Sequence, residues 1–188
     1  MKKYEFTGEE KLVDNHTLHR IRAVRDFGTV KAGDLGGWIE GKDNLSHDGN
    51  AWVGDNARVI GDAWVIGDAW VIGNAWVGDN AQVIGAARVT GDAWVGGNAL
   101  VTGDAWVGDN ARVGGNADFS VISGFGRFFR TTTFFRCQDG KVRTQCGCFY
   151  GDLNEFRANV KETHGESRMA KEYLMIADLM EMHFASEE

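Results

Sequence analysis

The residues best suited to binding chemistry lie in a basic segment, residues 127–150. Its five basic side chains are opposed by one acid, Asp139, which gives the segment a charge of +4 in a chain of net charge −7. Guanidinium groups, hydroxyls and aromatic faces together suit a nucleotide or another anion. The candidate ligand-binding residues are Arg127, Arg130, Thr131, Thr133, Arg136 and Arg143. The alternative is structural: the phenylalanines of this segment pack on C-terminal helices, and its arginines pair with the acidic segment 151–188.

Histidine is the commonest general base, and its distribution argues against catalysis in the middle of the chain. The histidines are His16, His19, His47, His164 and His183. None lies within residues 51–118, and only His47 falls in the repeat described below, at an inward position of an early copy. We interpret His47 as a packed or capping residue, so the sequence predicts no catalytic residue.

Cys137, Cys146 and Cys148 are the only cysteines, and an odd number of them within twelve residues does not form a disulfide framework. With His164 they could ligate zinc, because Cys146 and Cys148 share a strand face, but the spacing matches no standard zinc motif. Buried free thiols are the alternative. We therefore expect no metal and no cofactor, and a reducing compartment.

These residues must be positioned by a repeat that fills half the chain. From Val53 to Asp118 the sequence reads as eleven consecutive hexads of the type VIGDAW, and weaker copies begin near Leu35. In a strand, alternate residues share a face, so valine and alanine point inward and tryptophan or arginine points outward. Glycine, aspartate and asparagine supply the backbone angles that turn a corner after each short strand.

This pattern resembles the hexapeptide-repeat family, whose fold is a left-handed parallel β-helix with three hexads per coil. The resemblance implies a mainly β fold with about five coils over residues 35–124. Segments 25–53 and 131–165 also resemble uncharacterised, prophage-encoded hexapeptide-repeat proteins of the YdcK-like kind. Members of the family commonly form trimers, so the resemblance implies a homotrimer.

Outward residues eighteen positions apart stack on one face of such a prism. The first face reads Trp52, Trp70, Arg88 and Trp106, and the second reads Arg58, Trp76, Trp94 and Arg112. The third reads Ser46, Trp64, Gln82, Leu100 and Asp118. The first two faces combine indoles with guanidinium groups, which favours ring stacking and cation-π contacts. Exposed indole columns indicate an interface for self-association or for a partner, and the alternative is that they only stabilise the prism.

The flanks are predicted to be separate modules. Residues 1–34 contain alternating β-forming stretches around the turn VDNHT and predict a β-hairpin that caps the prism. Residues 125–188 predict a small α+β part, a hairpin with Asp139 and Gly140 at its turn followed by two helices. The first helix begins at a capping box of Asp152 and Glu155, and the second begins at Ser167.

Charge and composition exclude several classes of function. Eight acids oppose three arginines within residues 51–118, so the prism is not a general nucleic-acid binder. No stretch is long and apolar enough for a membrane span or a secretory signal, so the expected location is the cytoplasm of a bacterial host cell. We therefore predict a non-enzymatic, oligomeric phage or prophage accessory protein, an antagonist of host defence that binds a host protein or a small nucleotide. The alternative is a coenzyme A-dependent acyltransferase of the hexapeptide-repeat type.

Overall fold

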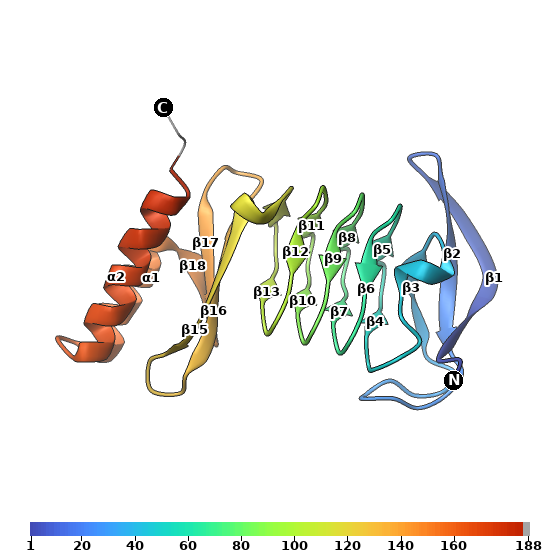
Figure 1. Cartoon of the computed structure of the whole chain (residues 1–188), viewed down its shortest axis with the longest axis horizontal. Coiled ribbons are helices and arrows are strands. Elements are labelled where there is room, and N and C mark those ends of the chain that lie inside the picture. The colour runs from blue at the N-terminus through green and yellow to red at the C-terminus, as the bar shows by residue number, and fades with distance from the viewer. Residues whose placement is uncertain (186–188) are drawn as a thin grey trace.

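The computed structural model describes residues 1–185 and shows an elongated molecule with three parts arranged in chain order (Figure 1). A hairpin of β1 (Tyr4–Val13) and β2 (His16–Ala23) lies at one end. A four-stranded sheet covered by two helices lies at the other end, and a parallel β-helix connects the two. The predicted mainly β fold is therefore confirmed.

The β-helix consists of β3 and eleven two-residue strands. Their bounds are β3 (Leu35–Ile39), β4 (Trp52–Val53), β5 (Arg58–Val59), β6 (Trp64–Val65), β7 (Trp70–Val71), β8 (Trp76–Val77), β9 (Gln82–Val83), β10 (Arg88–Val89), β11 (Trp94–Val95), β12 (Leu100–Val101), β13 (Trp106–Val107) and β14 (Arg112–Val113). The first face is β4-β7-β10-β13, the second is β3-β5-β8-β11-β14 continued by the hairpin, and the third is β6-β9-β12. Twelve strands at three per coil make about four coils, fewer than the five expected.

The repeat buries its small residues as predicted. The eleven repeat valines from Val53 to Val113 are fully buried, and the repeat alanines from Ala51 to Ala111 are at most 2% exposed. Corners need left-handed backbone: Gly85 has φ +74°, and a Cβ there would lie 3.1 Å from the nitrogen of Gly103 in the next coil. Short strands and glycine corners therefore follow directly from the hexad.

The β-helix ends earlier than predicted. Residue 119, at the next inward valine position, is phenylalanine, whose ring is too large for the close-packed prism interior. The chain forms the short 3-10 turn η2 (Asn116–Asp118), and β15 (Phe119–Phe125) then joins the C-terminal sheet. The predicted limit at residue 124 is corrected to Val113, and Asp118 does not belong to the third face.

The first coil has a different register from the rest. Ile39 pairs with Val59 and Leu45 with Val65, both twenty residues apart, whereas later partners are eighteen apart. Two extra residues are therefore accommodated before β4. Leu45 takes the inward position that the sequence assigned to His47, and the His47 ring lies against Tyr4, with centroids 4.4 Å apart. The inward placement of His47 was wrong.

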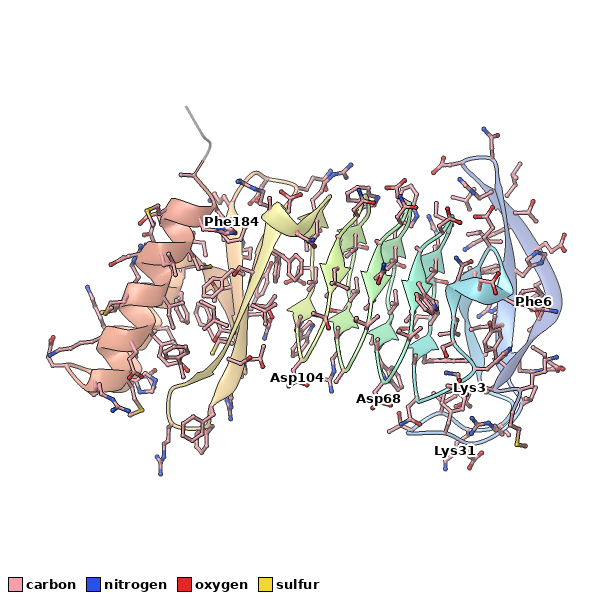
Figure 2. The ribbon with its side chains drawn as sticks, in the orientation of Figure 1. Lys3, Phe6, Lys31, Asp68, Asp104 and Phe184 are labelled. Carbon is pink, nitrogen blue, oxygen red and sulfur yellow. The ribbon has the colours of Figure 1, made fainter. Side chains whose placement is uncertain are left out.

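At each end of the β-helix, polar groups from elsewhere in the chain satisfy the backbone groups that have no neighbouring coil: donors cover free carbonyl oxygens at the N-terminal end, and acceptors cover free N–H groups at the C-terminal end. Strand N–H groups donate to the following coil, so the first coil leaves carbonyl oxygens free. The carbonyl of Ala51 accepts from Lys3 Nζ at 2.8 Å, that of Ala57 from the Trp38 N–H at 2.9 Å, and that of Ala63 from Asn44 Nδ2 at 2.8 Å. Figure 2 shows Lys3 at this end of the prism. The Trp38 N–H belongs to β3 of the β-helix itself, and the side chains of Lys3 and Asn44 supply the donors on the other two faces.

The last coil leaves N–H donors free, and acceptors cover them. The N–H of Trp106 donates to Thr133 Oγ1 at 3.0 Å, that of Leu100 to Asn116 Oδ1 at 2.8 Å and that of Gly114 to Asp118 Oδ2 at 2.9 Å. Because these acceptors come from η2 and the following sheet, the C-terminal part is a cap for the prism.

The C-terminal sheet separates the prism from the helices. Its antiparallel strands are β15, β16 (Arg130–Arg136), β17 (Val142–Cys146) and β18 (Phe149–Asp152). The fully buried Phe135 belongs to the prism core on one side, and Phe134 packs against Phe156 of α1 on the other, with ring centroids 6.0 Å apart. The turn between β16 and β17 contains Gly140 with φ +77°, which confirms the predicted hairpin.

Both helices begin where the sequence predicted. α1 (Leu153–His164) has Asp152 as N-cap in a capping box with Glu155, and α2 (Arg168–His183) has Ser167 as N-cap. In α2 the side chains of Tyr173, Ile176 and Met180 are buried, whereas Leu179 is 48% exposed. Within residues 1–185, neither helix is long and apolar enough to span a membrane.

Candidate binding site

A groove of about 720 Å³ lies between the C-terminal sheet and the helices. One wall is the turn between β15 and β16, and the other is formed by the end of α1 and the start of α2. The lining residues are Arg127, Phe128, Arg130, Cys146, Cys148, Phe149, Tyr150, Phe156, Asn159, Val160, Thr163, His164, Ser167, Met169 and Tyr173. A volume of this size is typical of small-molecule sites.

The groove is basic although the chain is acidic. Arg127 and Arg130 line it, and no aspartate or glutamate does. Within residues 1–185 neither arginine forms an ion pair. Both guanidinium groups instead lie over the ring of Phe128, at 5.5 Å for Arg127 and 5.0 Å for Arg130. Their charge therefore remains available to an anion.

The turn that carries these arginines is unusual in its exposure and backbone. Phe128 and Phe129 are 66% and 73% exposed at its tip. Phe129 has φ +51°, a left-handed conformation that costs free energy in a residue with a bulky side chain. Phe128, which lines the groove, and Phe129, which does not, thus both face solvent rather than the core.

The floor of the groove is apolar and closed by Tyr173. Its hydroxyl donates to the carbonyl of Phe125 at 3.2 Å, and its ring stacks on His164 with centroids 5.9 Å apart. Burial, followed by the neighbouring Cys146 thiol, raises the pKa of Tyr173 to about 12. Tyr173 therefore stays neutral at physiological pH and offers a hydroxyl for hydrogen bonding in the groove.

Four of the six predicted ligand residues are engaged elsewhere. Thr133 is 1% exposed and caps the prism, so its assignment to a ligand site was wrong. Arg136 pairs with Asp118 at 3.3 Å. It also donates to the carbonyl of Phe184 at 2.7 Å, and Phe184, labelled in Figure 2, is the C-cap of α2. Arg143 pairs with Asp139 at 2.7 Å. Thr131 bonds the Ser123 hydroxyl at 2.9 Å.

The alternative for segment 127–150 was that its phenylalanines pack on the C-terminal helices, and this is correct for only some of them. Phe134 packs on the helices, but Phe135 packs on the prism, because neighbouring residues of a strand face opposite sides. Within the described residues 151–185, no acid pairs with these arginines: Arg136 and Arg143 use Asp118 and Asp139. Sequence proximity to an acidic segment did not indicate these partners.

The three cysteines differ in burial and are all free thiols. Cys137 is buried in the prism core, where burial raises the pKa of its thiol. Cys146 packs against the helices and accepts from Thr132 Oγ1 at 3.1 Å, and Cys148 is exposed. In the part of the chain that the structure describes, no three His, Cys, Asp or Glu side chains gather in a metal-binding arrangement.

Indoles of the first two faces lie along the prism rather than project from it. A Cβ on Gly96 would lie 2.5 Å from Trp94 Cζ2, so this indole covers the glycine two residues further along the same face. Trp76 and Trp94 meet edge to face at 6.4 Å, and the Arg112 guanidinium lies 4.8 Å over Trp94. These contacts stabilise the second face as the ring and cation-π pattern predicted.

The exposed column of outward side chains on the first face is shorter than the sequence suggested. Arg88 lies 5.9 Å over the Trp106 ring, but Trp52 is only 4% exposed and packs edge to face with Phe27 at 5.4 Å. The segment after the N-terminal hairpin folds over the first rung and removes Trp52 from the surface. Trp52 is therefore corrected from an interface residue to a core residue.

The third face, which the sequence did not single out, is the one without charge. Its outward residues are Ser46 on the first rung and then, in pairs, Trp64 and Ile66, Gln82 and Ile84, and Leu100 and Thr102. Trp64 is 46% and Leu100 37% exposed. The other faces carry Arg88 on one, and Glu40, Arg58 and Arg112 on the other.

Comparison with known proteins adds one relative. A 70-residue stretch is 36% identical to a protein of Escherichia coli (strain K12) named an uncharacterised acetyltransferase, YdcK. The match covers 32% of this chain and 22% of that protein, so it spans about a fifth of the relative's length. No family model matches the chain. The relative, the hexads and the parallel coils together fit a hexapeptide-repeat β-helix.

Proposed function

We propose that this hexapeptide-repeat β-helix protein is a non-catalytic binding scaffold that associates with copies of itself through its third face. The observation that carries the proposal is that four successive rungs of this face hold no charged side chain, in a chain of net charge −7. Copies of an acidic chain repel one another, so they approach most easily along an uncharged face. The exposed parts of Trp64 and Leu100 supply apolar area to bury there.

The first two faces are less suited to self-association. Their indoles already cover glycines of the same prism or meet arginines of neighbouring rungs, as at Trp94. Copies meeting along these faces would also have to remove guanidinium groups from water, which costs free energy unless each finds a partner. For these two faces we therefore favour the alternative given by the sequence, that the tryptophans stabilise the prism itself.

The corners beside the third face add a testable property. Asp68 and Asp104 project along one of its edges, where Figure 2 shows them at the side of the prism, and Asp62 and Asp79 lie at the corners along the other. Like-charged rims repel in an assembly, and salt screens that repulsion. Association through this face is therefore expected to strengthen between low and physiological salt.

The experiment is sedimentation velocity on the wild type and on Trp64→Glu and Leu100→Glu. Each change places a carboxylate in the uncharged face, and both variants should be monomeric under conditions in which the wild type is a trimer or another oligomer. Trp106→Glu is the matched control, because Trp106 is as exposed as Leu100 but lies on the first face. A monomeric wild type would refute self-association, and dissociation by Trp106→Glu alone would transfer the interface to the first face.

Two finer expectations rest on the sequence resemblance. One is a homotrimer, and the other is a role in a phage-infected bacterial cell, where the scaffold would antagonise host defence by binding a host protein or a nucleotide. Neither follows from the geometry of the faces, and both stay predictions.

Acyl transfer from coenzyme A is a second candidate, favoured by the similarity to the protein named an acetyltransferase. His47, which the sequence indicates as a packed or capping residue, is the one histidine that falls in the predicted repeat and hence the candidate base for this alternative. Its Nδ1 accepts the N–H of Lys3 at 3.2 Å, and burial, followed by Lys3, lowers its pKa. Release of coenzyme A thiol from acetyl-coenzyme A, measured with wild type and His47→Ala, tests this function. Turnover lost in the variant would establish catalysis.

A further inference from the structure

We propose that the groove beside the helices binds a nucleoside phosphate, with the phosphate at the arginines of the β15–β16 turn and the base among the aromatic rings. This site is separate from the third face and does not depend on self-association. It is argued from three properties of the groove: its charge, its aromatic lining and its size.

The charge of the groove selects an anion. Arg127 and Arg130 bring two guanidinium groups to one wall, and no carboxylate lines the cavity. On the facing wall, Ser167 caps the start of α2, whose sixteen residues direct the positive end of the helix dipole to the same space. Guanidinium groups match phosphate oxygens with paired hydrogen bonds, so phosphate is the anion that fits best.

The aromatic lining selects a ligand with a flat ring. Phe128 is 66% exposed at the groove, and Phe149 and Phe156 lie deeper within it. Exposed rings on a protein surface favour stacking partners, and a nucleobase offers a π-face of the required size. The side chains of Asn159 and Thr163 add hydrogen-bonding groups for the edge of a base or for a sugar.

Size and surroundings favour a small ligand over a polymer. A cavity of about 720 Å³ is within the range of small-molecule sites. A nucleic-acid strand would extend beyond the groove over a chain of net charge −7. Repulsion by that excess negative charge opposes a long polyanion, whereas a single nucleotide is held within the groove, beside Arg127 and Arg130.

Isothermal titration calorimetry with the full chain tests the site. The probes are the four ribonucleoside monophosphates, the matching nucleosides and inorganic phosphate. We expect at least one monophosphate to bind at one site per chain, and its nucleoside and inorganic phosphate to bind at least tenfold more weakly. Arg127→Gln and Arg130→Gln should each weaken binding about ten- to a hundredfold, the usual effect of losing a charged hydrogen bond. Phe128→Ala should weaken the monophosphate but not inorganic phosphate.

The matched control is Arg88→Gln, which removes an arginine that also lies over an aromatic ring, Trp106, but on the prism. It should leave binding unchanged. Circular dichroism of each variant establishes that the fold is retained, and the exposed positions of Arg127 and Arg130 make unfolding an unexpected result. Absence of binding for all four monophosphates at millimolar concentration would overturn the proposal. So would equal binding of inorganic phosphate, or an affinity unaffected by both arginine substitutions.

Discussion

Substituting Lys3 by methionine should remove a pH dependence of stability that the buried ammonium group creates. Lys3 is fully buried, its Nζ donates to the Ala51 carbonyl at 2.8 Å, and it lies 5.1 Å over the ring of Phe27. Burial, followed by the nearby Arg25, lowers the pKa of Lys3 from 10.5 to about 8. Between these two pH values the unfolded chain binds more protons than the folded one, so the free energy of unfolding must rise with pH.

The size of the effect follows from the two pKa values. With about 8 in the folded state and an ordinary lysine value when unfolded, the free energy of unfolding should rise by roughly 1–2 kcal/mol between pH 7.5 and 9.5. Lys11, whose pKa is also lowered to about 8 by burial and then by Arg58, adds a rise of the same sign. Above this window the raised pKa of Tyr173 acts in the opposite direction, so measurements should stop at pH 9.5.

The assay is urea unfolding followed by circular dichroism at pH 7.5 and 9.5 for wild type, Lys3→Met and Lys31→Met. Lys31 is an exposed lysine at the same end of the molecule, as Figure 2 shows, and its substitution should preserve the full rise. In Lys3→Met the rise should be smaller than in the wild type by roughly 1–2 kcal/mol, and the part due to Lys11 should remain. A full rise in Lys3→Met would mean that Lys3 is not the titrating group, and the argument from its burial would fail.

Two further substitutions test the caps. Thr133→Val should lower the free energy of unfolding by about 1–3 kcal/mol, because it leaves the Trp106 N–H without an acceptor at the end of the prism; Thr131→Val, at a half-buried site, should cost less. Equal losses in the two variants, measured by urea unfolding, would contradict the capping role. Asp152→Ala should cost about 1 kcal/mol, because the carboxylate caps two N–H groups of α1, and an unchanged midpoint of unfolding would rule out that contribution.

Much of the fold could be predicted because the hexad is a local code. Alternation along a two-residue strand determines that Val77 points inward and Trp76 outward, and glycine or aspartate at the next positions determines the corner. The eighteen-residue register of the faces then follows from counting. The capping box at Asp152 and the turn at Gly140 are equally local, and both were predicted correctly.

Some features were predicted in kind but not in position. The first-coil register could not be obtained by counting, because two extra residues fit before β4 and exchange His47 for Leu45 at the inward position. Trp52 was placed outward correctly within its strand, yet a segment twenty-five residues earlier, around Phe27, covers it. Burial by a distant segment leaves no trace in the local pattern.

The candidate site shows the same division. Composition alone identified Arg127 and Arg130, which reach the groove, and could not separate them from Arg136 and Arg143, which are neutralised by acids of the fold. The facing wall, including Ser167, belongs to the helices, and only the tertiary structure shows that the helices pack there. Helical spacing places Asn159 and Thr163 beside the buried Phe156 and Val160. It does not show which part of the protein Asn159 and Thr163 face.

The sequence by itself therefore determined the prism, its corners, its three faces and the caps of both helices, because each depends on residues within a few positions or on a constant repeat. The tertiary structure alone decided which faces stay exposed and uncharged, that Thr133 completes the last coil, and that two arginines of the basic segment line a groove. These outcomes depend on contacts between segments far apart in the chain, whose free energies depend on how the modules dock rather than on any local pattern.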